Sequence, residues 1–312
     1  MAIRRHRAVP RVTPCELVRF EATDGIPLAG LLYEPKRRST RVMIFLHGTG
    51  GSSVFESTRT NVLAAELVAA GVAYFPFNNR GAHVMRRMGS EMGGYSYERI
   101  RGCVFDIDGA VRELRRRGYR DITLIGHSTG ANKVAVYDHY KQRNFVKRYV
   151  LLGGGDDTGL LYEELGARRF TDALTKARAM IKARRGDELA PPSIAKLPMS
   201  WRSFYDMANP DGDYNVFPFL EVMRGIRLSR RPRFRYVRAI RKPALFLYGE
   251  HDEYCIDSAS ATAAVLAEVL PRNAELAILA DADHGFGGKE RELANVILNW
   301  MGDDPEVMLM AP

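Results

Sequence analysis

The sequence predicts an α/β fold in which helices cover both faces of a mostly parallel sheet of about eight strands. Three observations predict it. Short β-branched and aromatic runs alternate with longer amphipathic segments along most of the chain. Several of the short runs are apolar at nearly every position, which is typical of parallel strands buried on both faces. The alternation is interrupted between residues 156 and 240 and then resumes.

The first half of the chain is expected to begin with an antiparallel pair. Residues 16–22 and 26–35 predict two strands joined by a turn at Thr23-Asp24-Gly25. A buried strand, a helix and a second buried strand are expected over 41–48, 59–71 and 72–81. After a loop rich in glycine and methionine, residues 97–118 predict a helix, because arginines precede the closing Gly118 as at a helix C-terminus.

The second half continues the alternation around one long break. The expected strands are 121–126, 148–155, 242–250 and 274–281, and the expected helices are 131–143, 257–270 and 290–301. Within the break, residues 171–186 are helical in pattern and residues 201–219 are rich in aromatic side chains. We therefore predict a core formed by residues 1–155 and 241–312. A helical cap, or lid, of residues 156–240 is inserted after the sixth strand.

Composition limits the class of protein. The 312 residues are 46% hydrophobic and 27% charged, as in an ordinary globular domain. The sequence contains neither an apolar run of about eighteen residues nor a signal-peptide core, and arginines interrupt the first twelve residues, so we expect a cytoplasmic protein. Cys15, Cys103 and Cys255 are widely spaced, which predicts free thiols and no zinc site.

Residues 124–132, LIGHSTGAN, contain a glycine two positions before and two positions after Ser128. A serine nucleophile above a parallel sheet sits on a sharp, strained strand-to-helix turn, where neighbouring residues must be small. A predicted strand precedes Ser128 and a predicted helix follows it, in the order that this turn requires. We interpret Ser128 as a nucleophile; the alternative is a structural serine in an ordinary loop.

A serine nucleophile needs a base, and the base needs an acidic group that fixes its tautomer. Asp252 follows the predicted strand 242–250, and His284 follows the predicted strand 274–281. The chain order Ser, Asp, His is a recurring order for such a triad. The rival acids are Asp257, Asp281 and Asp283, and the rival histidines are His83, His139 and His251.

The loop FLHGTGGSS follows a buried strand and carries three glycines, which allow the main chain to approach a substrate closely. We expect the amides of Thr49 and Thr129 to form an oxyanion hole, with Gly50 as the alternative donor. The stretch lacks G-x-G-x-x-G and the lysine of a P-loop, so nucleotide binding is not favoured. His47 is expected to hydrogen-bond within the loop.

With these motifs in order, the chain resembles an α/β-hydrolase from FLHGTGG to ADHGF, almost its whole length. Within that superfamily, GHSTGANK, VLLGGGDDTG, YDMANPDGDYNVFPF and YGEHDEYC are similar to a group of bacterial and fungal serine hydrolases whose fungal relatives include siderophore-degrading esterases. The resemblance implies an ester or amide substrate of some size. It does not imply which substrate, because the cap that sets specificity varies most in such enzymes.

The net charge is +9, and residues 227–242, called the basic strip below, contain basic side chains and no acidic one. Nothing else resembles a nucleic-acid reader, so we expect either a solvated face or attraction of an anionic substrate. Trp201, Phe204 and Tyr205 are candidate substrate contacts as well as candidate cap packing. Asp156 and Asp157 either cap a helix or bind a cationic group of a substrate.

The sequence thus predicts a serine esterase that acts on a small-molecule ester, bulky or anionic, without cofactor, metal, nucleic acid or membrane. Thioesterase, lactonase and amidase activities are alternatives on the same residues. A different class, a ligand-binding protein of this fold with negligible turnover, also stays open, as does a homodimer.

Overall fold

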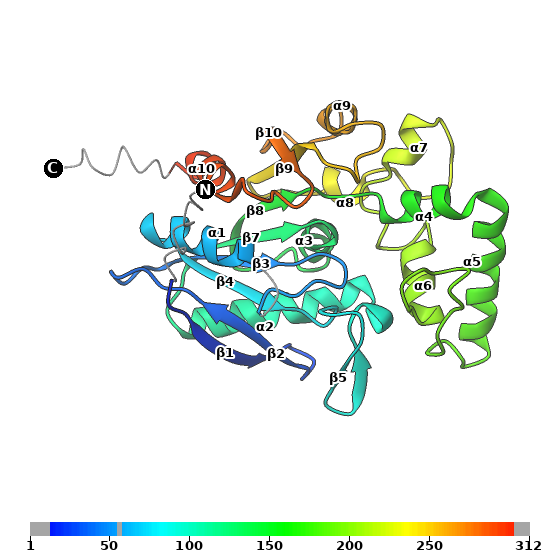
Figure 1. Ribbon diagram of the computed structural model, residues 1–312, viewed down its shortest axis with the longest axis horizontal. Coiled ribbons are helices and arrows are strands. Elements are labelled where there is room, and N and C mark those ends of the chain that lie inside the picture. The colour runs from blue at the N-terminus through cyan, green and yellow to red at the C-terminus, as the bar shows by residue number, and fades with distance from the viewer. Residues whose placement is uncertain (1–12, 55–57, 303–312) are drawn as a thin grey trace, which may run out of the picture.

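The computed structural model describes residues 13–54 and 58–302 and is built around one eight-stranded sheet (Figure 1). The order across the sheet is β1-β2-β4-β3-β7-β8-β9-β10. These strands span Glu16–Glu21, Pro27–Leu32, Ala73–Asn78, Arg41–Leu46, Asp121–His127, Val146–Leu152, Ala244–His251 and Ala274–Asp283 in that order. Only β2 runs against its neighbours, so the carboxyl ends of the other strands meet at one edge of the sheet. The predicted fold class is confirmed.

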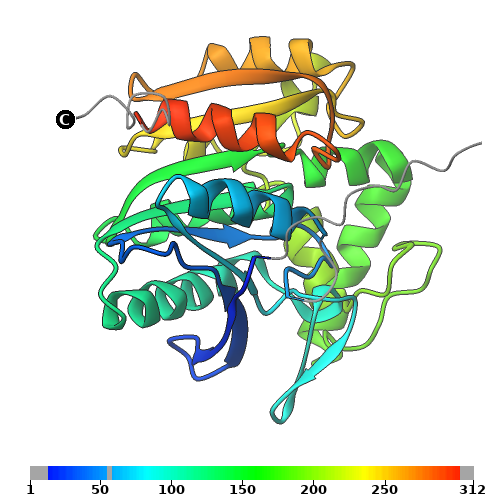
Figure 2. The same ribbon diagram turned by 60° about the vertical axis from the view of Figure 1, so that its left-hand side comes forward.

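Two sets of helices cover the two faces, because alternate residues of the buried strands point to opposite sides. Helices α1 (Thr58–Ala69) and α10 (Glu290–Trp300) pack on one face, where Figure 2 shows them together. Helices α2 (Cys103–Arg116), α3 (Thr129–Tyr140) and α9 (Ala259–Ala267) pack on the other. Each apolar strand therefore contributes to two separate hydrophobic clusters.

The segment predicted as a cap contains five helices and no strand of the main sheet. They are α4 (Asp157–Leu165), α5 (Ala167–Lys182), α6 (Trp201–Ala208), α7 (Phe219–Met223) and α8 (Arg235–Arg238). Helices α4 to α7 gather beyond one end of the sheet, on the right in Figure 1. Their apolar side chains join the core cluster on the α2, α3 and α9 face. The division into two domains stays a prediction.

Two elements differ from the expectation. The loop rich in glycine and methionine contains a hairpin of β5 (Arg86–Met88) and β6 (Glu91–Gly93), whose three-residue strands are too short for an alternating pattern. The helix expected over 97–118 begins only at Cys103. Two 3-10 turns, η1 (Tyr95–Tyr97) and η2 (Ile100–Gly102), precede it, and the Asp206 carboxylate accepts a hydrogen bond from the Ile100 amide at 2.7 Å.

Three expectations from composition concern membrane-spanning helices, the N-terminal residues and the cysteines. No helix within residues 13–54 and 58–302 is both long and apolar enough to cross a bilayer. The arginine-rich residues 1–12 lie outside the described residues. The three cysteines are free, with Cys15 exposed, Cys103 buried and Cys255 half-buried.

A buried ion pair joins helix α3 to the chain that precedes α2. Lys133 Nζ lies 2.6 Å from Glu98 Oε1, and the two side chains are 0% and 1% exposed. The Lys133 ammonium also donates to Asn79 Oδ1, just after β4, at 3.3 Å. A side chain at Gly81 would overlap Glu98, since its Cβ would lie 2.1 Å from Oε2. The pair thus ties three chain segments together directly behind the start of α3.

Removal of one partner should leave the other charge buried and uncompensated. We expect Lys133→Met to lower the free energy of unfolding by about 3 to 5 kcal/mol. The double variant Lys133→Met/Glu98→Gln should be less destabilised than the single one, because no formal charge then stays buried. Urea unfolding of the three proteins measures this, and equal losses in the single and double variants would contradict it.

Candidate active site

Ser128 occupies the turn between β7 and α3 with φ 58° and ψ −130°, a backbone conformation that residues other than glycine rarely adopt. The two flanking glycines make this turn possible. A Cβ at Gly126 would lie 2.1 Å from the Gly130 carbonyl oxygen, and a Cβ at Gly130 would lie 2.4 Å from the Leu46 carbonyl oxygen. The G-x-S-x-G spacing is therefore a steric requirement of the close contact between β7, α3 and β3.

Asp252 and His284 meet at the ends of β9 and β10. His284 Nδ1 donates to Asp252 Oδ1 at 2.8 Å, and the Asp252 carboxylate side chain is 1% exposed. The Tyr254 amide donates to the same Asp252 oxygen at 3.0 Å, which holds the carboxylate in place. With the Nδ1 proton directed to the carboxylate, the other ring nitrogen of His284 is an available base.

The end of β10 is adapted to present His284. The register of β10 against β9 shifts between Leu279 and Asp283, and there the His284 amide donates to Glu253 Oε2 at 3.1 Å. Gly249 permits the close approach of the strands, since its Cβ would lie 2.4 Å from the Asp283 carbonyl oxygen. A bulge of this kind re-aims the residue that follows it.

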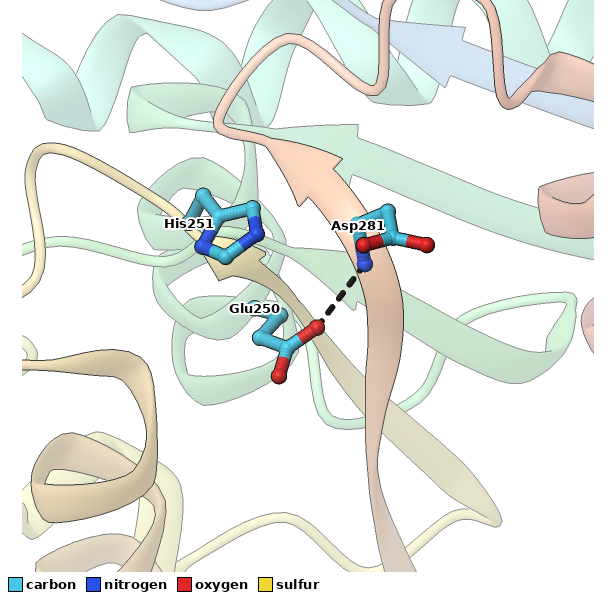
Figure 3. A group of neighbouring side chains, drawn as sticks. All are labelled: Glu250, His251 and Asp281. Atoms are coloured by element: carbon cyan, nitrogen blue, oxygen red, sulfur yellow. Dashed lines mark hydrogen bonds between the residues drawn. The ribbon is translucent and has the colours of Figure 1, made fainter.

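The rival acids and histidines lie elsewhere. Asp257 pairs with Arg224 through two hydrogen bonds of 2.7 and 2.8 Å. Asp281 and His251 belong to an exposed group with Glu250, whose carboxylate accepts from the Asp281 amide at 2.9 Å (Figure 3). The potential ligand atoms of these three residues lie within 4.8 Å of one another. This spacing suits one divalent cation, a grouping that we did not predict.

The remaining alternatives for the acid and the base, Asp283, His139 and His83, contact other parts of the protein. The Asp283 carboxylate accepts from the Gly287 amide at 3.0 Å. The His139 ring packs edge-on against Tyr236, at 4.8 Å between ring centroids, and the His83 amide donates to the Gly51 carbonyl. None of these three residues lines the cavity that contains Ser128.

The glycine loop after β3 lies against the serine turn. A Cβ at Gly48 would lie 3.2 Å from Ser128 Oγ, and Thr49 Oγ1 is 2.5 Å from Thr129 Oγ1. The Gly51 amide donates to the Gly48 carbonyl, so this turn closes on itself. The His47 ring bonds the Gly48 carbonyl at 2.8 Å, as expected, and burial lowers its pKa to about 3, so the ring is neutral.

Ser128, His284 and Thr49 line one cavity of about 640 Å³. Apolar side chains dominate the rest of its wall. Those from the predicted cap are Leu160 and Leu161 of α4, Met207 of α6, and Ile194, Ala195, Leu197 and Met199 of the loop between α5 and α6. A pocket of this size and character suits a small organic ligand held by a few polar groups.

The loop between α5 and α6 is fixed to the core at η1. The Ser200 amide donates to the Ser96 carbonyl at 2.7 Å, and Ser96 Oγ donates to the Pro198 carbonyl at 2.6 Å. The Tyr95 hydroxyl contacts the Met199 sulfur at 3.0 Å. The cavity wall formed by residues 194–199 is therefore anchored by main-chain and side-chain bonds.

The candidate substrate contacts Trp201, Phe204 and Tyr205 do not line this cavity. Trp201 and Phe204 are 5% and 0% exposed within the hydrophobic core, so the packing role explains them. The Tyr205 hydroxyl accepts from Arg178 Nε at 3.2 Å. The amphipathic pattern of α6 could not distinguish a buried face from a ligand-facing one.

The basic strip also lies away from Ser128. Arg231 and Arg235 line a different cavity of about 870 Å³, which shares no lining residue with the Ser128 cavity. In that cavity Arg101 pairs with Asp213 at 2.8 Å. The preference for anionic substrates stays a prediction without a contact to support it.

Two further residues at the site, His127 and Tyr254, lacked a sequence signal. The His127 ring bonds the His284 carbonyl at 2.7 Å, and the Tyr254 ring packs on the His284 ring at 4.6 Å between centroids. Asp156 caps α4 by accepting from the Gly159 amide at 2.7 Å, whereas Asp157 lines the cavity. The sequence placed both aspartates after a strand but could not separate their roles.

The sequence profile of the alpha/beta hydrolase family matches residues 43–296. A search of curated proteins found no significant match. Among solved structures, GrgF from Penicillium sp. sh18, an alpha/beta hydrolase, is similar with a TM-score of 0.64 and 16% identity, covering 92% of this chain and 98% of its own. Est1E from Butyrivibrio proteoclasticus has a TM-score of 0.56 and 17% identity over 92% and 98%. The Pyrococcus furiosus esterase Pf2001 has a TM-score of 0.55 and 14% identity over 93% and 91%.

The steric role of the serine turn can be tested by adding one methyl group. Gly126→Ala should lower the free energy of unfolding by about 3 kcal/mol, because its Cβ would meet main-chain atoms that cannot move aside. Gly155→Ala is the matched control, since no atom lies within 4 Å of its Cβ. Thermal and urea unfolding measure both, and equal stability of the two variants would contradict the steric reading.

Proposed function

Because this chain belongs to the alpha/beta hydrolase family, we propose that it is a serine hydrolase that cleaves carboxylic esters through an acyl-enzyme intermediate. The observation that carries the proposal is the 2.8 Å hydrogen bond from His284 to buried Asp252 at the cavity that also contains Ser128. A histidine oriented by a carboxylate beside a serine on a strained turn is the arrangement that activates a serine hydroxyl.

In the proposed reaction, Ser128 Oγ attacks the ester carbonyl while His284 Nε2 accepts the hydroxyl proton. The Asp252 carboxylate keeps the second imidazole proton on Nδ1 and stabilises the charge that forms on the ring. Protonated His284 then gives the proton to the departing alkoxide, which leaves an acyl group on Ser128. Water, deprotonated by His284, then attacks the acyl carbon, and protonated His284 returns the proton to Ser128 Oγ as the acid leaves.

The negative oxygen of the tetrahedral intermediate needs preorganised donors. We propose the amides of Thr49 and Thr129 for this role, with Gly50 as the alternative. Thr129 begins α3, so its amide has no acceptor within the helix. The positive end of the helix dipole adds to the stabilisation of the oxyanion. The contact between the two threonine hydroxyls supports a fixed distance between the two donors.

The mostly apolar wall favours a substrate whose acyl or alcohol part is largely hydrophobic. A thioester, lactone or amide fits the same residues, and the leaving group that is cleaved fastest distinguishes these activities. A ligand-binding protein with negligible turnover is the competing function from another class. Turnover of 4-nitrophenyl esters separates the two functions, whereas covalent labelling by a fluorophosphonate shows only that the serine is activated.

Removal of the nucleophile gives the first test of activity. We expect Ser128→Ala to reduce kcat for 4-nitrophenyl esters by about 10⁴- to 10⁶-fold, because no covalent intermediate can form. Fluorophosphonate labelling should disappear as well, while the melting temperature changes little. Turnover near that of the wild type in a folded Ser128→Ala protein would refute the assignment.

The acid is tested by comparing two carboxylates near the same strand ends. Asp252→Asn should reduce kcat by roughly 10²- to 10⁴-fold, because the histidine is then stabilised in the wrong tautomer. Asp281→Asn should retain activity, since Asp281 is exposed and contacts Glu250 instead of His284. Steady-state kinetics measure both. A large loss in Asp281→Asn with a small one in Asp252→Asn would show that the acid is misassigned.

A further inference from the structure

Asp157 is an acidic side chain beside the proposed oxyanion hole that the proposed reaction does not use. It is the first residue of α4 and lines the same cavity as Ser128, Thr49 and His284. Its neighbour Asp156 is occupied in capping α4 and also accepts from the Leu220 amide at 2.8 Å. A structural role at the helix start is therefore already filled, and Asp157 needs a separate explanation.

The hydrogen bonds of Asp157 fix only one of its two oxygens. Oδ2 accepts from Asn132 Nδ2 at 3.1 Å and from Thr129 Oγ1 at 3.4 Å. Because an ionised carboxylate only accepts, Thr129 directs its proton to Asp157, and the Thr49 hydroxyl directs its own to Thr129. Within residues 13–54 and 58–302, no donor to Oδ1 is found.

The Asp157 carboxylate forms no ion pair within the described part of the chain, because Lys133 and His284 act on its charge only at longer range and Lys133 is itself paired with Glu98. The other carboxylate of the cavity wall, Glu164, pairs with Lys196 at 3.0 Å. No described lysine, arginine or histidine lies within 4.0 Å of Asp157. Burial raises the pKa of Asp157 to about 6, so the group is still ionised at pH 8. A carboxylate without an ion-pair partner on the cavity wall attracts a cationic group of a ligand and repels an anionic one.

We propose that Asp157 is a specificity-determining residue that binds a cationic group of the substrate near the scissile carbonyl. This inference rests on the proposed esterase function. The substrate class is then an ester with an ammonium group in its acyl or alcohol part and an apolar remainder that fits the rest of the wall. The basic strip does not oppose this choice, because none of its residues lines the Ser128 cavity.

The test uses two pairs of esters that have the same shape and differ only in charge. For the alcohol part, butyrylcholine is compared with 3,3-dimethylbutyl butyrate. For the acyl part, the 4-nitrophenyl esters of 4-(trimethylammonio)butanoate and 5,5-dimethylhexanoate are compared. The quaternary ammonium keeps its charge at every pH. All assays are run at pH 8, and the measured quantity is the ratio of kcat/KM for the charged and neutral members of each pair.

In the wild type, the charged ester of at least one pair should be favoured about tenfold, which corresponds to about 1.4 kcal/mol. Asp157→Asn keeps the shape of the side chain and should bring that ratio close to one, with the neutral ester little affected. Asp157→Glu keeps the charge and should retain part of the preference. Glu163→Gln is the matched control, because Glu163 lies on the exposed side of the same helix, and it should leave the ratio unchanged.

A ratio near one in the wild type for both pairs would overturn the inference. An equal loss of kcat/KM for charged and neutral esters in Asp157→Asn would also overturn it, because Asp157 would then only orient Thr129 and Asn132. Failure of the proposed function is distinguishable, because then no ester is cleaved. In that case the inference is decided by calorimetry, which measures binding of the same esters to Ser128→Ala and to Ser128→Ala/Asp157→Asn. Ser128→Ala should bind the charged ester more tightly than the neutral one, and the double variant should lose this difference. Equal affinity of Ser128→Ala for the two esters would overturn the proposal.

Discussion

The close contact of three main-chain segments, at Leu46, Gly126 and Gly130, is the constraint on which the site depends. Helix α3 can start directly above β7 only because neither glycine carries a Cβ that would strike the facing carbonyls. The same contact forces Ser128 into its positive φ and brings the Gly48 loop beside the Ser128 hydroxyl. The strain at Ser128 is tolerated because the main-chain contacts at Gly126 and Gly130 fix the turn, and the buried Lys133–Glu98 pair holds α3 from behind.

Asp252 and His284 are positioned by an irregularity in strand pairing and not by a glycine turn like that of Ser128. Their strands lie at the far edge of the sheet, and a register shift in β10 replaces regular pairing just before His284. The side chain of Glu253 satisfies the His284 amide there, and the His284 carbonyl is bonded by the ring of His127, which adjoins Ser128. The two halves of the site are thus connected through His127 as well as through the sheet.

Sequence patterns predicted the sheet, its flanking helices and the strand ends that carry Ser128, Asp252 and His284, because buried parallel strands have a strong apolar signal and glycines mark the turns. The sequence left Trp201 and Phe204 between cap packing and substrate contact, since an aromatic face looks the same whether it packs on a core or on a ligand; in the fold both are buried in the core. His127 carries no local signal, and the sequence left Asp157 between a helix cap and a residue that binds a cationic group. Their roles arise from neighbours in space, such as Asn132 and the His284 carbonyl, that only the folded chain brings near.

The anchoring of the loop between α5 and α6 has a consequence for how this enzyme can diversify. The bonds from Ser96 to Pro198 and Ser200 use main-chain atoms of the loop, so they do not depend on which side chains the loop carries. Ile194 and Leu197 face the cavity from this fixed backbone. Substitutions at these two positions can reshape the cavity without moving the serine turn, which makes them suitable positions for a small combinatorial library.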